Sequence, residues 1–447
     1  MKEMKICIIG GGSRMWAIKF FRDLTRNKDV HGTINLYDID YAAAEGNIRN
    51  AERIFALNGD EGHFTVHAYK DIAPALKGCD LVIISIEPGA TECRYGDLVI
   101  PEKYGVLESV GDTTGPGGIM RARRAIPLFL GFAKEIGRNC PEAWVINYTN
   151  PMTLCTAALY RGFPAIKAMG CCHEVFNTES FIAELVAKWF HVPEPDRREI
   201  LIDLTGVNHF TWVTRASWKG IDLMPRLKAY ASDPSLYADH TKEAMERLKS
   251  EKWYDNDHLI ALTLLRDFGV LGAAGDRHLA EFLPWFLTSD KELNSYGVIR
   301  TPYEWRVRVA KEKRNKVFKD DELIAGPTNE EGVDIMKSLM GERTLRTNIN
   351  RPNEGQLSYL PKGRIVESNG FLSENNITPL VSSDPPLAVM NMVRRVSDVQ
   401  EMTLDAVVEN DDGLLFEAFL SDPLMSIGRR EARKMFDEMM VASAIRY

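Results

Sequence analysis

The chain has 447 residues, of which 45% are hydrophobic and 26% charged, and it carries a formal net charge of -8 with a pI near 5.7. This length suits two large domains, and the acidic balance without a basic stretch argues against nucleic acid or an anionic membrane as a partner. No run of about 18 apolar residues occurs, so no membrane span is expected.

The cysteine pattern and the N-terminal residues both indicate a cytoplasmic location. The seven cysteines are odd in number and scattered without a framework spacing, which predicts free thiols in a reducing cytoplasm. The N-terminus leads directly into a strand pattern and lacks the long apolar segment of a signal peptide. We therefore expect a cytoplasmic protein.

The first forty residues alternate strand, helix and strand. Residues 5–9 form an apolar run that ends in the glycines 10–12, residues 16–25 have a helical pattern, and residues 34–38 form a second strand that ends in an acid. A second helix is expected over residues 41–57. This order is typical of a dinucleotide-binding βαβ unit.

The alternation continues further along the chain. The remaining expected elements are strands at 65–68, 80–85, 144–148 and 165–170 and a short helix at 71–76. The pattern predicts an α/β fold with a Rossmann-type, doubly wound parallel sheet at the N-terminus. Pro193 and Pro195 mark a plausible boundary, so we expect an NAD-binding domain over 1–195 and an α+β domain for substrate binding and oligomerisation over 196–447.

Glycines that follow a first strand let the backbone approach a pyrophosphate. The predicted cofactor-binding residues are Gly10, Gly11, Gly12, Ser13 and Asp38. Met15 stands where the third glycine of the usual fingerprint would be. An acid at the end of the second strand accepts hydrogen bonds from ribose hydroxyls and repels a 2′-phosphate, which favours NAD over NADP.

Polar groups also follow two later strands. Asn150 lies in an Asn-Pro turn after the strand at 144–148, and Cys172 and His173 follow the strand at 165–170. Ligands of open α/β sheets bind at the carboxyl ends of strands, so these side chains are candidates for a site.

An ordered set of short motifs runs from residue 5 to about residue 430. Its members are the glycines at 10–12, Arg94 ahead of 100–105, 112–118, 147–151, 172–173, 208–210, 275–282, 353–356, 360–361 and 366–367. This set resembles glycoside hydrolase family 4, the NAD- and divalent-metal-dependent glycosidases. Segments 170–176 and 275–282 are most similar to the α-galacturonidase branch of that family.

The resemblance implies an unusual hydrolysis. NAD+ takes a hydride from C3 of the sugar, a base then removes the acidified C2 proton, and a metal ion stabilises the enediolate. The C1–O bond breaks by elimination, water adds back, and the hydride returns. NAD is therefore recycled during each turnover.

The resemblance also assigns roles to residues. Cys172 and His209 occupy the family's metal-ligand positions, and Mn2+ is the metal that the family favours. His173 matches the general acid, and Asn150 and Arg94 match substrate-binding positions. Asp112 is implied to serve the metal or the nicotinamide end of the site.

The base is left with two candidates. Some members of the family use a tyrosine, but this chain has His278 at the matched position. Either His278 or Asp276 is then the catalytic base, and Arg277 between them is a candidate for binding a substrate carboxylate.

The resulting prediction is a hydrolase that cleaves α-galacturonides with NAD and Mn2+, acts on a small α-glycoside, and forms a homodimer or homotetramer. Alternatives within the family are an α-galactosidase or an α-glucuronidase. A 2-hydroxyacid dehydrogenase would release NADH and need no metal, and a non-catalytic NAD sensor would need no proton donor. The charge-rich segment 304–314 is expected to be a solvated helix face that could also shape a subunit contact.

Overall fold

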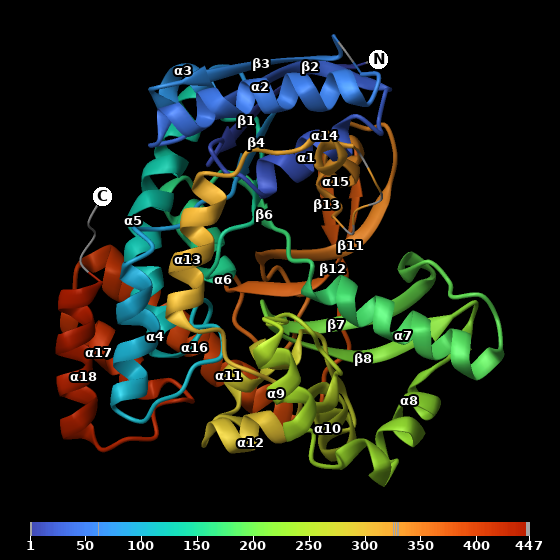
Figure 1. The fold of residues 1–447 in the computed structure, drawn as a ribbon, viewed down its shortest axis with the longest axis vertical. Coiled ribbons are helices and arrows are strands. Elements are labelled where there is room, and N and C mark those ends of the chain that lie inside the picture. The colour runs from blue at the N-terminus through green and yellow to red at the C-terminus, as the bar shows by residue number, and fades with distance from the viewer. Residues whose placement is uncertain (1, 61, 325, 327, 329, 444–447) are drawn as a thin grey trace.

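The computed structural model describes residues 2–60, 62–324, 326, 328 and 330–443. One mixed sheet of 13 strands runs through these residues, with helices packed along both of its faces (Figure 1). Its central order is β10-β8-β7-β12-β11-β6-β5-β4-β1-β2-β3. β13 pairs with β12 and β9 with β8 at the sides of this path.

The N-terminal half contains six parallel strands and the helices between them. The strands are β1 (Lys2–Ile9), β2 (Val30–Tyr37), β3 (Phe64–Tyr69), β4 (Leu81–Ile84), β5 (Trp144–Asn147) and β6 (Lys167–Gly170). The helices are α1 (Trp16–Leu24), α2 (Tyr41–Leu57), α3 (Ile72–Leu76), α4 (Cys93–Lys103), α5 (Gly115–Asn139), α6 (Met152–Gly162) and α7 (Glu174–Phe190). The order β3-β2-β1-β4-β5-β6 is the Rossmann arrangement, and it confirms the predicted fold class.

The C-terminal half adds antiparallel strands and many helices. The strands are β7 (Ile200–Val207), β8 (Phe210–Trp218), β9 (Ile221–Asp222), β10 (Leu271–Gly272), β11 (Leu345–Pro352), β12 (Ile365–Ser373) and β13 (Asn376–Pro379). The helices are α8 (Met224–Ala231), α9 (Thr241–Lys249), α10 (Leu259–Phe268), α11 (Asp276–Phe282), α12 (Asp290–Ser295), α13 (Tyr303–Arg314), α14 (Asp320–Leu323), α15 (Gly332–Leu339), α16 (Leu387–Glu409), α17 (Asp412–Ser421) and α18 (Arg429–Ala442).

Alternation along the parallel strands explains the two layers around them. Ile6 and Ile8 of β1 pack in a core with α1, α2 and α15, whereas Cys7 and Ile9 pack in a second core with α5 and α6. Successive side chains of a strand point to opposite faces, so a strand that is apolar throughout must be covered on both sides.

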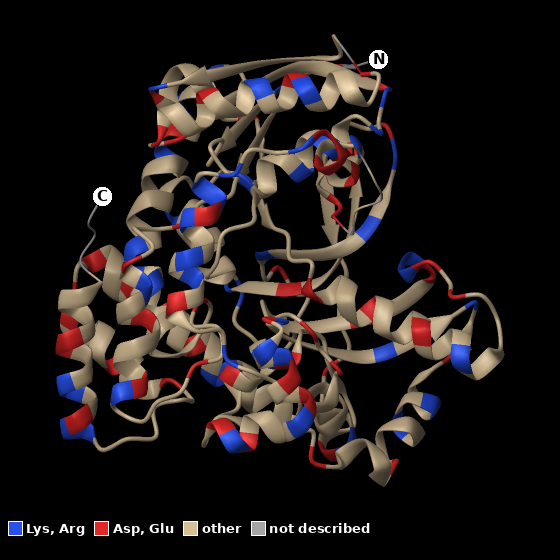
Figure 2. Cartoon of the chain, viewed as in Figure 1, with Lys and Arg blue, Asp and Glu red and all other residues tan. Residues whose placement is uncertain are grey.

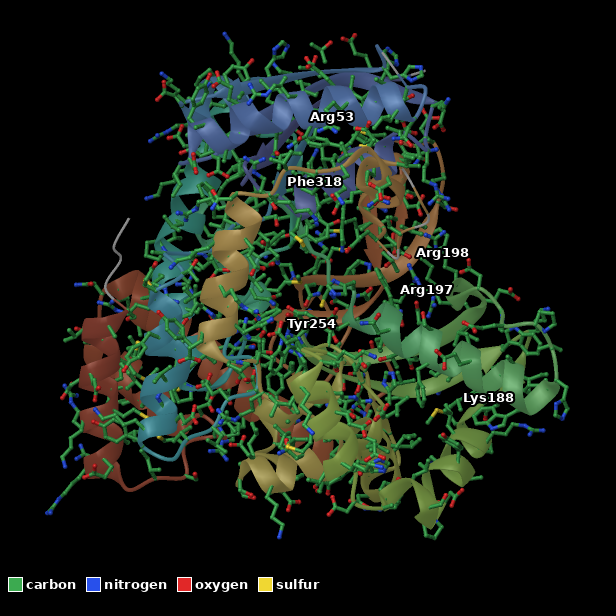
Figure 3. All side chains as sticks on the ribbon, in the orientation of Figure 1. Arg53, Lys188, Arg197, Arg198, Tyr254 and Phe318 are labelled. Carbon is green, nitrogen blue, oxygen red and sulfur yellow. The ribbon has the colours of Figure 1, made fainter. Side chains whose placement is uncertain are left out.

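The division predicted at residue 195 does not interrupt the sheet. β11 pairs antiparallel with β6, and β7 pairs with β12, so strands of the second half extend the sheet of the first. Arg53 on α2 also donates to the backbone oxygen of Phe318, which joins the two halves at the top of the molecule (Figure 3). The exact domain boundary stays a prediction.

The surface carries both signs of charge. In the view of Figure 2, Lys and Arg are interspersed with Asp and Glu over most elements, in keeping with the moderate net charge. Among the described residues, no helix combines the length and the apolar character that crossing a membrane requires.

Candidate active site

The loop after β1 brings three backbone segments into contact. The N–H groups of Gly10 and Gly11 both donate to the Tyr37 carbonyl oxygen, at 2.9 and 3.0 Å. Gly10 has φ +94°, and a Cβ atom there would lie 2.0 Å from the Ser85 carbonyl oxygen. Only glycine therefore permits this approach of β1 to the ends of β2 and β4.

Asp38 closes the same loop from the end of β2. Its Oδ2 accepts a hydrogen bond from the Gly12 N–H at 2.9 Å, and Oδ1 accepts one from the Asp40 N–H. Burial raises the pKa of Asp38. Ser13 stabilises the start of α1, because its Oγ accepts a hydrogen bond from the Trp16 N–H at 3.0 Å. The glycine loop, Ser13 and Asp38 thus form a cradle at a helix N-terminus, which fits a dinucleotide.

The turn after β5 presents an unused acceptor. The Asn150 Oδ1 atom is buried and has no hydrogen-bond partner in the described part of the chain. The Asn150 carbonyl oxygen accepts from Arg121 Nε at 2.9 Å, and Arg121 forms an ion pair with Glu87. The position is compatible with an Asn150 side chain that binds a substrate hydroxyl.

Cys172 is buried directly after β6. Its carbonyl oxygen accepts from Asn348 Nδ2, and its thiol hydrogen-bonds with the side chain of Asn208. Burial, together with Glu367 and Glu174, raises the pKa of the Cys172 thiol well above its usual value. A bound cation would oppose this effect, because a coordinating thiol is deprotonated.

His209 sits in the two-residue turn between β7 and β8, next to Asn208. Its φ is +63°, in the left-handed region that such a turn requires. Thr113 Oγ1 lies 2.8 Å from His209 Nδ1, which orients the ring. Burial lowers the pKa of His209, so the neutral imidazole that binds metals is the stable form.

Asp112, His209 and His278 come together from three separate segments. One possible ligand atom of each lies within 4.8 Å of those of the other two. His278 Nδ1 is buried without a hydrogen-bond partner among the described residues. Burial lowers the pKa of His278 to about 3. A carboxylate and a neutral imidazole suit a divalent cation such as Mn2+, so Asp112 and His209 can bind the metal here, and His278 beside them can either complete the ligand set or accept a proton.

The pKa of Asp112 lies well below its usual range, so its carboxylate stays ionised in this group. Burial raises this pKa, but at a pH low enough to protonate Asp112 the two histidines are protonated as well, and their charge together with that of Arg121 outweighs burial. Cys172 is not part of the group of three, although its neighbour Asn208 directly precedes His209. The sequence-predicted ligands Cys172 and His209 are therefore adjacent through this turn.

Glu174 links two of the candidate catalytic histidines. Its Oε1 lies 3.8 Å from His173 Nε2 and 3.9 Å from His278 Nε2, and its Oε2 accepts from the Gly275 N–H at 2.8 Å. Burial raises the pKa of Glu174, but the surrounding histidines outweigh it and bring the pKa to about 2. The position directly after Cys172 and His173 was the sequence signal that could have drawn attention to this residue.

Asp276 faces the start of a helix. Its Oδ1 accepts from the Ala261 N–H at 3.0 Å, at the N-terminus of α10, where the preceding residue His258 supplies no side-chain cap. Burial raises the pKa of Asp276 to about 7. The Asp276 carboxyl thus stabilises the first turn of α10, in addition to lying two residues from His278.

Arg94, on α4, is buried against the loop that carries Asp112. It donates to the carbonyl oxygens of Val110 and Gly111, at 2.8 and 2.7 Å, and lies 3.4 Å from Asp97. These contacts hold the backbone next to Asp112 and add positive charge to the site.

A cavity of about 770 Å3 opens beside His173 and Glu174. Its lining includes His173, Glu174, Asp276, Arg277 and Tyr254. The Tyr254 side chain, labelled in Figure 3, is exposed. The Arg277 guanidinium lies over its ring, 4.7 Å from the centroid. The half-exposed His173 therefore borders a space large enough for a leaving group.

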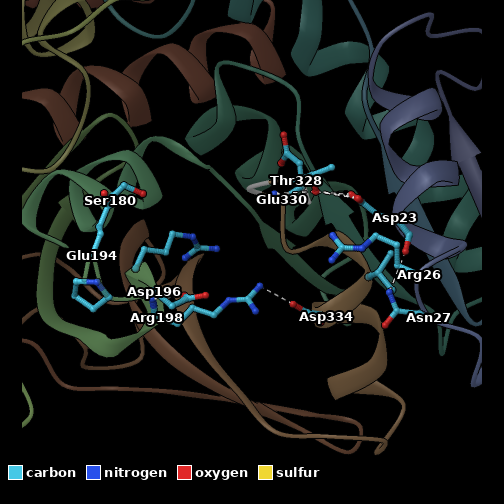
Figure 4. Close-up of a pocket in the computed structure, with 13 residues that line it drawn as sticks. Asp23, Arg26, Asn27, Ser180, Glu194, Asp196, Arg198, Thr328, Glu330 and Asp334 are labelled. Carbon is cyan, nitrogen blue, oxygen red and sulfur yellow. Dashed lines mark hydrogen bonds and ion pairs between the residues drawn. The ribbon is translucent and has the colours of Figure 1, made fainter. Parts of the chain in front are cut away.

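A second cavity, of about 460 Å3, lies elsewhere, among α1, the segment before β7 and α15 (Figure 4). Two contacts join residues of its lining: Arg198 Nη2 is 2.7 Å from Asp334 Oδ2, and Thr328 donates to Asp23 at 2.9 Å. None of the sequence-predicted site residues lines this cavity, which is therefore distinct from the candidate active site.

The comparisons with known proteins agree on one family. Residues 5–188 match the family described as Family 4 glycosyl hydrolase, and residues 204–425 match the Family 4 glycosyl hydrolase C-terminal domain. An α-galacturonidase of Bacillus subtilis (strain 168) is 39% identical over 448 residues, covering 98% of this chain and 97% of the relative.

Solved structures share the fold. The crystal structure of the Bacillus subtilis protein lplD, described as a glucosidase, has a TM-score of 0.90 at 39% identity and covers 98% of this chain and 100% of that chain. A 6-phospho-β-glucosidase of Thermotoga maritima has a TM-score of 0.76 at 19% identity, with 98% of each chain covered. The two matched segments and the near-complete coverage leave one conclusion: this chain belongs to the family 4 glycosyl hydrolases.

Proposed function

We propose that this glycosidase hydrolyses α-galacturonides with the help of NAD and a divalent metal, Mn2+ being the first candidate. The observation that carries the proposal is the convergence of Asp112, His209 and His278 in a fold that also has a glycine cradle after β1. The α-galacturonidase that is 39% identical supports the sugar, and the Thermotoga maritima structure with manganese, NAD+ and glucose-6-phosphate supports the cofactors.

When bound, NAD would accept and return a hydride at C3 of the sugar, and the metal would polarise the sugar oxygens. The NAD site consists of Gly10, Gly11, Gly12 and Ser13, with Asp38 on the ribose hydroxyls. Cys172, His209 and Asp112 would hold the metal.

Other residues of the chain bind and orient the substrate. The unpaired Asn150 Oδ1 accepts a hydrogen bond from a sugar hydroxyl. Arg94 holds the backbone beside Asp112 through two carbonyl oxygens and contributes positive charge toward the bound sugar.

Two histidines move protons. His173, at the edge of the 770 Å3 cavity, donates a proton to the glycosidic oxygen of the leaving group. We assign the removal of the C2 proton to His278 rather than Asp276, because the ring of His278 lies against His209 whereas Asp276 accepts a hydrogen bond from α10. Glu174, close to both histidines, positions them.

The test uses p-nitrophenyl α-galacturonide and p-nitrophenyl α-galactoside, with NAD+ and Mn2+ each added or omitted, in D2O. We expect cleavage of the galacturonide that needs both additions, with deuterium at C2 of the released sugar. Cleavage of the galactoside alone would keep the mechanism and change the substrate, and net release of NADH would replace the hydrolase mechanism with that of a dehydrogenase.

Two further properties belong to the same proposal. All seven cysteines are free and buried, which fits a protein of the reducing cytoplasm. A homodimer or homotetramer is proposed, and light scattering coupled to size-exclusion chromatography measures it directly.

A further inference from the structure

The charge-rich helix α13 runs beside α4 (Figure 1) and carries Arg306, which faces the loop before α5. The sequence suggested a solvated face for this segment, and most of its charges are indeed at the surface. Arg306 differs, because its Nη2 donates to the Val110 carbonyl oxygen at 2.9 Å and its Nε is buried without a hydrogen-bond partner among the described residues.

Two other arginines surround the same point. The Val110 carbonyl oxygen also accepts from Arg94 Nη2 at 2.8 Å, so two guanidinium groups touch one oxygen atom. Arg277 is the third, and its Nη1 donates to the Trp253 carbonyl oxygen and to Thr301 Oγ1, both at 3.2 Å. Burial, followed by the charges of Arg94 and Arg277, lowers the pKa of Arg306 to about 9.

The nearby buried arginines that do have carboxylate partners provide a contrast. Arg124 is paired with Asp97 at 2.6 Å, and Arg121 with Glu87. In the part of the chain that the structure describes, neither Arg306 nor Arg277 forms an ion pair with a carboxylate. A desolvated cation without a counter-ion is costly, and a bound anion would relieve this cost.

The unpaired cations adjoin the reacting end of the site. Val110 is two residues from Asp112, and Arg277 directly precedes His278. A galacturonide carries its one ionised group at C6, so this carboxylate is the part of the substrate that an unpaired guanidinium beside the site would attract.

We propose that Arg306, assisted by Arg277, binds the C6 carboxylate of the substrate and thereby makes the enzyme specific for uronides over neutral hexosides. The inference rests on the proposed α-galacturonidase function and names the residue that selects its substrate. The guanidinium fork pairs with a carboxylate through two hydrogen bonds, which a CH2OH group cannot replace.

The experiment compares wild type, Arg306→Ala, Arg306→Lys and the control Arg308→Ala. Arg308 lies on the same helix but is exposed and paired with Glu251. Binding of galacturonate and of galactose to the NAD- and Mn2+-loaded enzymes is measured by calorimetry, and kcat/KM is measured on the two p-nitrophenyl substrates. Melting temperature and NAD affinity report on folding.

For Arg306→Ala we expect galacturonate affinity and kcat/KM on the galacturonide to fall by about 30- to 5,000-fold, the range for truncating one partner of a buried charge pair. Affinity for galactose should change by less than about threefold. Arg306→Lys should recover part of the loss, because the charge remains without the fork. Arg308→Ala should behave as wild type.

Wild-type galacturonate affinity in a folded Arg306→Ala variant would overturn the inference, as would an equal loss for galactose and galacturonate. Failure of the proposed function has a different signature. In that case the wild-type enzyme itself would cleave no α-galacturonide, whatever the variants do.

Discussion

The imidazole rings of His209 and His278 lie against each other, with centroids 4.0 Å apart and planes tilted by 35°. His209 comes from the β7–β8 turn and His278 from α11, so the contact joins segments that are far apart in the chain. Asp112 lies beside the pair, so the proposed metal ligands Asp112 and His209 and the proposed base His278 share one point of the structure. It also separates two roles, because one ring is proposed to bind the metal and the other to accept a proton.

Replacing these histidines should separate the roles. We expect His209→Asn to lower Mn2+ affinity by at least about tenfold, because one ligand is lost. His278→Asn should keep Mn2+ binding but lose the exchange of the C2 proton with D2O. Equilibrium dialysis measures the Mn2+ affinity, and NMR measures the exchange of the C2 proton. His67→Ala, at an exposed position, is the control. If His278→Asn loses Mn2+ as His209→Asn does, His278 is a ligand and not the base.

The neighbouring cysteines provide a matched pair. Cys172→Ser should weaken Mn2+ binding, since the thiolate is a proposed ligand. Cys171 packs in the core with α1 and α15, so Cys171→Ser should lower the free energy of unfolding by about 1 to 2 kcal/mol and leave Mn2+ affinity unchanged. Dialysis and urea unfolding distinguish the two effects. Unchanged Mn2+ affinity in Cys172→Ser would remove Cys172 from the site.

Asp38 should decide between the two nicotinamide cofactors. Asp38→Ala removes the acceptor for ribose hydroxyls, so NAD+ affinity should fall by about tenfold. It also removes the negative charge that repels a 2′-phosphate, so the ratio of NAD+ affinity to NADP+ affinity should decrease. Calorimetric titration with both cofactors measures this. Asp71→Ala serves as the control, since Asp71 is exposed after β3 and caps no helix through its side chain. An unchanged ratio of the two affinities would contradict the assignment.

Variants of Asp276 distinguish a structural role of this residue at the start of α10 from a role as the catalytic base. Asp276→Ala should lower the free energy of unfolding by about 1 to 2 kcal/mol through loss of the hydrogen bonds to the start of α10. Asp276→Asn keeps an acceptor there and should keep most of the stability and the activity, because His278 is the proposed base. Urea unfolding and initial rates are measured on both variants. A stable but inactive Asp276→Asn enzyme would instead make Asp276 the base.

Two buried glutamates should make stability depend on pH. Glu108 and Glu281 each keep one buried oxygen without a partner among the described residues. Burial raises the pKa of Glu281 to about 7 and, with repulsion from Glu281, raises the pKa of Glu108 well above its usual value. The folded state therefore holds protons that the unfolded chain releases near its ordinary glutamate pKa.

The sign of the effect follows from these shifts. The stabilising contribution is complete below the unfolded pKa and is lost as the pH rises through about 7. We expect Glu108→Gln to reduce the loss of unfolding free energy between pH 5 and 8 by about 1 to 3 kcal/mol. Denaturant titrations at several pH values measure it, with exposed Glu304→Gln as the control. The same pH dependence in both variants would contradict the prediction.

The parallel half of the fold could be inferred from the sequence, because its determinants are local. Apolar runs that end in glycine or acid mark strands, and the helical periodicity of residues 41–57 agrees with α2 (Tyr41–Leu57). The glycine loop and Asp38 are close in sequence as well as in space, so the cradle was predictable as a unit. The motif order likewise identified the family, which the comparisons confirm.

What only the tertiary structure decided involves partners that are distant in the chain. Asp112, His209 and His278 meet because the β7–β8 turn and α11 pack against the loop before α5, and no periodicity encodes that packing. The charge pattern of α13 is also the same whether an arginine faces solvent or protein. That Arg306 turns inward and meets the Val110 carbonyl depends on where α13 docks, which long-range burial determines and local propensity does not.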